Sequence, residues 1–531
     1  MLLSAGVILL ALSIAQFQAA QALAPQARIG AIDLNSAFHL PPLKTDILTP
    51  QISTLGVVQR AQALGIDGTT ATDAWQKGEK IFAQVETPVA GPALTFAGTQ
   101  ASVLNRLLER NLSVRVVSAV IEIDEPIRIA RSGVSLDLGT ATLRARQAIP
   151  YALRVERAEN VIVRGGEFAA GDSAILVNAA AHVLILDSKI HDLSGSGIVL
   201  THAARVIIRG NQISGMGAAP IVLHGGTNSS IVEQNEVVRN NGASNMAAGI
   251  VLSDRNVDLA AREEALYGPD GYWAIDEPMA SRLNPPRNNV IALNDLAWNA
   301  SSGVYVDGAV ANVVALNTIE GNAKEGLCLD NGSAANVVTS NGIFQNGNRW
   351  GESDEVMAKD SILGGGRLQD GTPAEKVPGI SVDNAIYNII FTNNVAHNFG
   401  GGVKIVRTGY FNLIGVNTIL DDNEGASAGF HFFGVELGAT TLDAGSDGLD
   451  STPSRGNIVF SNDIRGSHYS GIFFDAGSDL NDVFDNVIID AQQWALESVD
   501  LMANSSLNNL TVIPSRNISA GLSTAVIESS Q

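Results

Sequence analysis

Acidic side chains recur at one position of a repeated short segment in the second half of the chain. Asp307, Asp330 and Asp383 each stand four residues after a glycine, and the next copy of the segment contributes Lys404 and is followed by Arg407. If these segments are neighbouring parallel strands, roughly 4.8 Å apart, the aspartates form a ladder of like charges. Such a ladder is unfavourable unless a carboxyl is protonated, a cation binds, or the basic residues compensate. These five residues are the candidate catalytic residues.

Two kinds of polysaccharide chemistry fit such a ladder. In a glycoside hydrolase, one protonated carboxyl acts as acid and a second, ionised one as base or nucleophile. Carboxylates on neighbouring rungs are about 5 Å apart, the retaining distance, and alternate rungs give roughly 9–10 Å, near the upper end of the inverting range. In a lyase or C5-epimerase, the three aspartates would bind Ca²⁺ against a uronate, and Lys404 or Arg407 would remove a proton. The hydrolase needs no cofactor or metal.

The aspartates also have an ordinary explanation. Aspartate often ends a strand because it caps the turn that follows, and Asp307-Gly, Asp330-Asn and Asp383-Asn are all turn-like pairs. A third class of function, a non-catalytic glycan-binding or surface-structural protein, would follow from that explanation. Substitution of these aspartates would then change little beyond stability.

Four further side chains are candidates for substrate binding. Tyr305 shares the acidic segment, and His431 takes the corresponding place in a later copy if Gly429 is the glycine of that copy. Trp273 and Trp350 lie in insertions between repeats, where aromatic rings beside a groove can stack on sugars. The alternative is that these rings pack the insertions onto the protein.

A repeat must position these side chains. The segment Asn289-Val-Ile-Ala-Leu-Asn294 returns at 312–317 and 336–341 and in later copies, and successive copies lie 23 or 24 residues apart where nothing is inserted. Short β-branched runs between Gly, Asn, Asp and Ser turns predict strands, and three strands and three turns fill one coil of a solenoid. The asparagines should stack along the axis, hydrogen-bond to one another and tolerate a left-handed turn conformation.

The glycine-led segment predicts a second strand in each coil. After Gly303, the first and third residues are aliphatic and should face the core, so the second and fourth should face outward. The fold class is therefore all-β, a single parallel β-helix solenoid of about 11–13 coils with a partly helical N-terminal cap and two or three insertions; its right hand is what the family resemblance given below implies.

The chain divides into four parts. Residues 1–24 form an apolar export segment, although the first basic residue is Arg28, and residues 25–112 form a lead-in with helical spacing at 70–85 and 99–111 that should cover the first coil. The β-helix spans 113–513 and the C-terminal tail 514–531. Insertions are expected near three places in the β-helix: 255–286, 347–377 and 437–456.

The repeat resembles the pectate-lyase-like superfamily of right-handed parallel β-helices over about 400 residues. That superfamily includes pectate lyases, polygalacturonases, alginate epimerases and phage tailspikes, so the resemblance implies a polysaccharide or oligosaccharide partner. It is one of architecture. The basic pair Lys404-Ile-Val-Arg407 has the wrong order and spacing for polygalacturonases, and the Asp-Pro-His-Asp motif of periplasmic alginate epimerases is missing.

Charge and composition limit the partners. The net charge of −21 and the lack of a Lys/Arg cluster argue against nucleic acid and favour a neutral glycan. No run after the export segment is long enough to span a membrane, and Cys328 is the only cysteine, which excludes an internal disulfide. We therefore expect an exported protein, periplasmic or extracellular, whose leading function is glycoside hydrolase. The oligomeric state is left open.

Overall fold

The computed structural model describes most of the chain between residues 61 and 514. The described residues are Ala61, 65–66, 68–83, 93–145, 149–169, 171–242, 245–254, 284–347, 377–406, 408–422, 433–438, 454–466, 470–474, Ser478, 481–489, 494–498 and 510–514. The expected export segment, most of the three insertions and nearly all of the C-terminal tail lie outside them.

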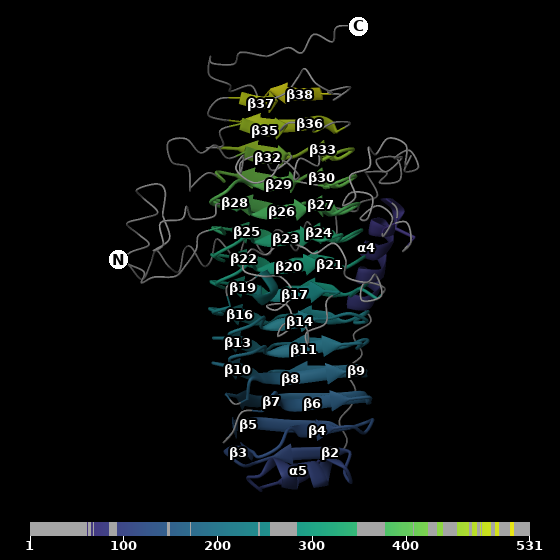
Figure 1. Cartoon of the computed structure of the whole chain (residues 1–531), viewed down its shortest axis with the longest axis vertical. Coiled ribbons are helices and arrows are strands. Elements are labelled where there is room, and N and C mark those ends of the chain that lie inside the picture. Colours follow the sequence, from purple (N-terminus) through teal and green to yellow (C-terminus); the bar gives the residue numbers. More distant parts are fainter. Residues whose placement is uncertain are drawn as a thin grey trace, which may run out of the picture. The chain divides into compact units, whose positions relative to one another are not determined.

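The described strands stack in parallel, one coil above another, as Figure 1 shows. Among the described residues one sheet has 13 strands, in agreement with the predicted 11–13 coils. Its strands are, in order along the stack, β4 (Ile127–Ile129), β6 (Tyr151–Glu156), β8 (Ser173–Asn178), β11 (Ile198–Thr201), β14 (Ile221–Leu223), β17 (Ile250–Ser253), β20 (Val304–Asp307), β23 (Leu327–Asp330), β26 (Ile380–Asp383), β29 (Val403–Val406), β32 (Phe433–Leu437), β35 (Ser470–Phe474) and β37 (Trp494–Ser498).

The other sheet has 25 strands and contains two columns that share the long strands β5, β7 and β36. The first column is β1 (Leu94–Phe96), β2 (Ser113–Val116), β5 (Ser135–Ala145), β7 (Glu159–Phe168), β9 (Ala181–Leu186), β12 (Ile207–Arg209), β15 (Ile231–Glu233), β18 (Val290–Ala292), β21 (Val313–Ala315), β24 (Val337–Thr339), β27 (Ile389–Phe391), β30 (Leu413–Gly415), β33 (Ile458–Phe460), β36 (Asp482–Ile489) and β38 (Leu510–Pro514). The second column adds β3 (Val120–Ile123), β10 (Lys189–His191), β13 (Gln212–Ser214), β16 (Glu236–Val238), β19 (Asp295–Ala297), β22 (Thr318–Glu320), β25 (Gly342–Phe344), β28 (Asn394–Ala396), β31 (Thr418–Leu420) and β34 (Asp463–Arg465). The all-β solenoid predicted from the repeat is confirmed.

The core is aliphatic and follows the predicted alternation. In β20, Val304 and Val306 are fully buried among inward-facing residues of other coils, and Leu327 and Leu329 repeat the arrangement one rung later in β23. Each coil therefore buries its apolar face only by stacking on its neighbours, which is why the unit must be repeated.

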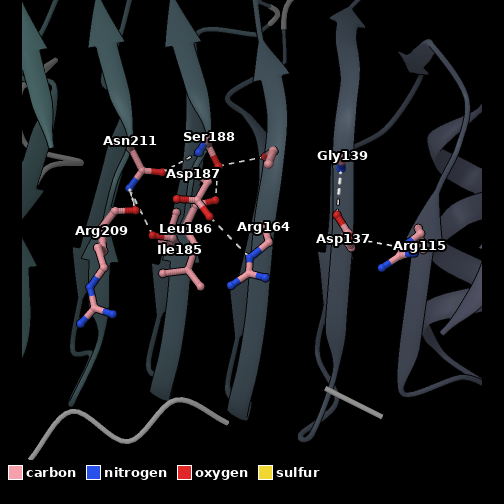
Figure 2. Close-up of polar contacts among 11 residues, drawn as sticks. Arg115, Asp137, Gly139, Arg164, Ile185, Leu186, Asp187, Ser188, Arg209 and Asn211 are labelled. Carbon is pink, nitrogen blue, oxygen red and sulfur yellow. Dashed lines mark hydrogen bonds and ion pairs between the residues drawn. The ribbon is translucent and has the colours of Figure 1, made fainter. Parts of the chain in front are cut away.

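The predicted asparagine stack is confirmed in the turns. Asn294 Nδ2 donates to Oδ1 of Asn317 at 2.9 Å, and Asn317 Nδ2 donates to Oδ1 of Asn341 at 3.0 Å. Figure 2 shows the start of this ladder, where Asn211 Oδ1 accepts from the backbone N–H of Ser188. A further ladder that the sequence analysis missed runs through Asn240, Asn299, Asn322, Asn346, Asn398 and Asp422.

The left-handed conformation belongs to the residue before each stacked asparagine, and the prediction that the asparagine itself adopts it is wrong. Leu293 and Leu316 have φ of 60°, whereas Asn294 and Asn317 have negative φ. The asparagine amide holds the turn by donating to the carbonyl two residues earlier, as Asn294 does to Ala292 at 3.1 Å. This bond stabilises a backbone conformation that leucine otherwise avoids.

The two predicted helices take different places. Helix α5 (Ala101–Leu108) covers the first coil as expected, and Asn105 Nδ2 donates to the Pro126 carbonyl beside β4. Helix α4 (Gly68–Ala83) instead packs along the flank of the solenoid, on β18, β21 and β24. Gly78 makes this possible, because a Cβ there would lie 2.7 Å from Val313 Cγ2. A short 3₁₀ helix, η2 (Asn245–Ala247), precedes β17. No helix among the described residues is long and apolar enough to cross a membrane.

Candidate functional site

The three aspartates stack at the same strand position, as the sequence spacing predicts. Asp307 ends β20 and is in register with Asp330 at the end of β23. Leu329 is in register with Val382, so Asp383 at the end of β26 follows on the next rung. Ser253 precedes Asp307 in this column. Neighbouring carboxylate-bearing positions are therefore roughly 4.8 Å apart along the stack.

The three carboxylates differ in how deeply they are buried, and the sequence analysis did not predict this difference. Asp307 is 0% exposed and Asp330 8% exposed, whereas Asp383 is partly exposed. The expectation of an outward ladder open to solvent therefore holds only for its Asp383 end. A fully buried carboxylate is tolerated only where hydrogen-bond donors satisfy it.

Donors surround Asp307 on two rungs. Ser253 Oγ donates to Oδ2 of Asp307 at 2.8 Å from the rung before. Asn331 Nδ2 donates to Oδ1 of Asp307 at 2.7 Å from the rung after. Each carboxylate oxygen of Asp307 thus has a donor, and these two hydrogen bonds fix the orientation of the group.

Asp330 is held by two more donors. Tyr305 donates its phenolic O–H to Oδ2 of Asp330 at 2.9 Å, and the backbone N–H of Asn331 donates to Oδ1 at 2.7 Å. Asn331 Nδ2 also lies 3.3 Å from the Tyr305 hydroxyl oxygen. Neutral donors therefore offset the like charges of Asp307 and Asp330.

Asn331 is the residue of this network that sequence analysis missed. Its backbone has φ of 53°, which turns the chain directly after β23 and brings its side chain back beside Asp307. The available signal was the Asp330-Asn331 pair, since Asp and Asn favour such turns. The turn interpretation of Asp330 and a role for its carboxylate are thus compatible.

Tyr305 does not present an open ring face. It is 3% exposed and belongs to an apolar cluster on the outer side of the 13-stranded sheet, with Val222, Val251 and Cys328 among its members. Its ring is buried and its hydroxyl donates to Asp330, so in this structure the polar contact of Tyr305 is with the carboxylate, and substrate binding by Tyr305 stays a prediction.

Lys404 pairs with a residue that the sequence analysis did not select. Lys404 in β29 is in register with Ser381 on one side and Glu436 on the other, and its Nζ lies 3.1 Å from Glu436 Oε1. The sequence analysis took Gly429 as the glycine of this coil and therefore placed His431 beside Lys404. This prediction is wrong: the glycine of the coil is Gly434, five residues later, and Glu436 takes the position beside Lys404. Lys404 therefore pairs with the following rung and not with the aspartates.

The remaining predicted site residues, Arg407, Trp273, Trp350 and His431, lie outside the described residues. Within the described part of the chain, no group of three or more His, Cys, Asp or Glu side chains is arranged to hold a metal ion.

A second group of carboxylates lies on the other sheet. Glu236 in β16 and Asp295 in β19 are in register on neighbouring rungs, and Glu320 in β22 is nearby. The pKa of Asp295 is raised, mainly by loss of hydration on burial and then by the charge of Glu236. The pKa of Glu320 is raised in the same way, mainly by burial and then by the charge of Asp295. These groups are exposed or partly exposed, and within the described part of the chain no donor network of the kind around Asp307 offsets the repulsion between neighbouring rungs.

Comparison with known proteins agrees with the fold. Residues 145–261 match the family described as the right handed beta helix region, so the predicted right-handed parallel β-helix is confirmed. No curated protein matches the chain.

Several solved structures are similar over most of the chain. The periplasmic alginate epimerase AlgG aligns with 77% of this chain and 84% of its own at 14% identity, with a TM-score of 0.41. The A-module of the mannuronan C-5 epimerase AlgE6 of Azotobacter vinelandii aligns over 75% and 88% at 14% identity, with a TM-score of 0.42. PfbA, a surface adhesin of Streptococcus pneumoniae, aligns over 78% and 97% at 11% identity, with a TM-score of 0.45. Since a fold of this kind serves different functions, the function must be argued from the residues of the site.

Proposed function

We propose that the protein is an exported glycoside hydrolase in which Asp330 and Asp383 are the catalytic carboxylates. The observation that carries the proposal is the orientation of Asp330 by Tyr305 and Asn331, one rung from the partly exposed Asp383. Neighbouring rungs put the two carboxylates about 5 Å apart, which is the spacing of a retaining glycosidase.

The hydrogen bonds suggest a division of roles. Two donors to Asp330 stabilise its negative charge, so Asp330 is the nucleophile. Asp383 is then the acid that protonates the departing sugar oxygen and the base that activates water in the second step. Asp307, which is fully buried, is a positioning residue that acts through Asn331.

The geometry favours hydrolysis over proton abstraction from a uronate. A lyase or epimerase needs a base beside the sugar; the candidates were Arg407, which lies outside the described residues, and Lys404. Its ammonium group is engaged by Glu436 at 3.1 Å, so it is better described as part of an ion pair than as a base. The Ca²⁺-dependent lyase or epimerase remains the alternative that the experiment must separate.

The test is a panel of neutral and uronic polysaccharides incubated with the purified protein, with and without a chelator. New reducing ends without ultraviolet absorbance of unsaturated products, unchanged by the chelator, are expected. Proton NMR should show that the anomeric configuration of the first product is retained. Unsaturated products that vanish with the chelator would transfer the assignment to a lyase. Glycan binding without any product would support the non-catalytic function.

A further inference from the structure

The Lys404–Glu436 pair is the charged part of this sheet face that follows the aspartates. The side chains of Lys404 and Glu436 are 22% and 14% exposed, so both are partly covered yet reach the surface. Lys404 lies one rung beyond Ser381 and Glu436 one rung beyond Lys404. The next rung places Phe473 beside Glu436, and the ring of Phe473 stacks on Phe433 at 4.1 Å.

We propose that this ion pair is a substrate subsite that selects uncharged sugars, and that Glu436 is the residue that determines this specificity. The inference rests on the proposed function for its substrate class, a glycan bound along the same face as Asp330 and Asp383. It concerns the binding of sugar units beside the reacting centre and assigns Glu436 no part in bond cleavage.

Charge gives the first reason. A lysine alone among the aspartates of this face would attract a uronate carboxylate. Glu436 forms an ion pair with that lysine and so adds a negative charge beside it. A uronate bound here would be repelled by the carboxylates of Glu436 and of the nearby Asp383. In a partly covered position such repulsion is screened by water less than on an open surface.

Hydrogen-bonding chemistry gives the second reason. A sugar hydroxyl is both a donor and an acceptor, so it can donate to the Glu436 carboxylate and accept from the Lys404 ammonium at the same time. A uronate carboxylate is only an acceptor, so it can accept from Lys404 but cannot donate to Glu436, whose negative charge repels it. The pair therefore suits neutral hydroxyl-bearing rings better than acidic ones.

The position along the stack gives the third reason. From Asp330 in β23 to Phe473 in β35 the register advances four rungs, or roughly 19 Å. Phe433 is partly exposed at the start of β32 and supplies an apolar surface beside the ion pair. A polar pair next to an aromatic surface matches the two kinds of surface that a sugar ring presents.

The experiment measures binding and not turnover. Neutral oligosaccharides and oligouronates of equal length are titrated calorimetrically into the full-length wild type and into Glu436→Gln, which keeps the size of the side chain and removes its charge. The wild type should bind a neutral oligosaccharide at least ~10-fold more tightly than any oligouronate. Glu436→Gln should gain ~10-fold or more for an oligouronate, and added salt should reduce that gain.

Two controls make the result specific. Glu320→Gln, on the other sheet, should leave both affinities unchanged. Lys404→Met combined with Glu436→Gln should abolish the gain for oligouronates, because the released ammonium is then missing. Thermal unfolding of each variant checks that it is folded.

Outcomes for this inference and for the proposed reaction are distinct. An oligouronate affinity that is the same in Glu436→Gln and the wild type, a wild type that prefers oligouronates, or binding of neither class by either form would overturn the subsite. A wild type that binds neutral glycans and gains oligouronate affinity on substitution, yet forms no product, would uphold the subsite and overturn only the hydrolase.

Discussion

The hydroxyl of Tyr305 donates to Oδ2 of Asp330 across one rung of the β-helix, at 2.9 Å. The two residues come from successive coils and meet because β20 and β23 are in register. Asp330 is thereby held from the outer side of the sheet by a ring that is itself buried in an apolar cluster. A carboxylate with its position and hydration controlled in this way is suited to catalysis.

Removal of that hydroxyl should impair turnover more than binding. Tyr305→Phe keeps the buried ring and deletes one hydrogen bond to a charged group, a contribution of about 1.5–3 kcal/mol. We expect kcat on the glycan identified by the panel to fall roughly 10- to 100-fold, with KM within a factor of about three. Steady-state kinetics checks this. Tyr387→Phe, a buried tyrosine in the turn between β26 and β27, is the control, and an equal loss in both variants would contradict the role of Tyr305.

The asparagine ladder should be a major source of stability. Asn317 accepts from the backbone N–H and side-chain amide of Asn294 and donates to the Ile291 carbonyl and to Asn341. Asn317→Ala leaves several of these buried groups without partners, so the free energy of unfolding should fall by about 3 kcal/mol or more. Urea denaturation measures it. Asn394→Ala, on the exposed side of β28, should cost less than about 1 kcal/mol, and similar losses would argue against the ladder.

Helix α4 gives a test in which helix propensity and packing oppose each other. An alanine in place of an exposed helical glycine stabilises by about 1 kcal/mol. At Gly78 the added Cβ would lie 2.7 Å from Val313 Cγ2, so Gly78→Ala should instead lower the melting temperature and speed proteolysis within α4. Gln76→Ala, on the exposed side, should do neither. A higher melting temperature for Gly78→Ala would show that α4 does not pack tightly on β21.

Glu167 should contribute to the acid dependence of stability. Lys189, then His191 and Thr142, lower the pKa of Glu167 from its ordinary 4.5 to about 2. A carboxyl whose pKa is lowered by folding stabilises the protein above its unfolded pKa, and this contribution is lost as the pH falls from about 4.5 to 2.

Glu167→Gln should therefore flatten the fall in melting temperature over that pH range. At neutral pH the variant should lose only about 0.2–1 kcal/mol, because the pairs are partly solvent-exposed. Thermal melts at a series of pH values measure both effects. Glu159→Gln, an exposed glutamate of the same strand, is the control. A wild-type slope in Glu167→Gln would show that the hydrogen bonds to Glu167 do not contribute.

The sequence predicted the fold well because each coil carries its own signal. The asparagine at the turn and the alternation after the glycine recur every 23 or 24 residues, so one correct coil gives the others. The ladder that runs from Asn240 to Asp422 was not predicted, because its early members, such as Asn240 and Asn299, do not lie in the repeated segment that begins and ends with asparagine. The position of α4 was not predicted, because the contact between Gly78 and Val313 joins residues more than 200 positions apart. No local sequence pattern encodes such a contact.

The site was predicted only in part. The column Asp307, Asp330 and Asp383 follows from spacing alone. Their unequal burial, and the hydrogen bonds from Tyr305 and Asn331, depend on side-chain directions that spacing does not give. The period breaks before β32, so the sequence offered two glycines for that coil, and the wrong one gave His431 instead of Glu436.

The central claim is that Asp330 is a catalytic carboxylate, and the most direct measurement is the rate of reducing-end release by Asp330→Asn. The substitution keeps the shape of the side chain and removes its charge, so the fold should be retained while kcat/KM falls on the order of 10³-fold or more. Asp187→Asn, at an exposed turn of the same solenoid, should keep wild-type activity. Near wild-type release by a folded Asp330→Asn would contradict the claim and leave Asp330 as a turn residue.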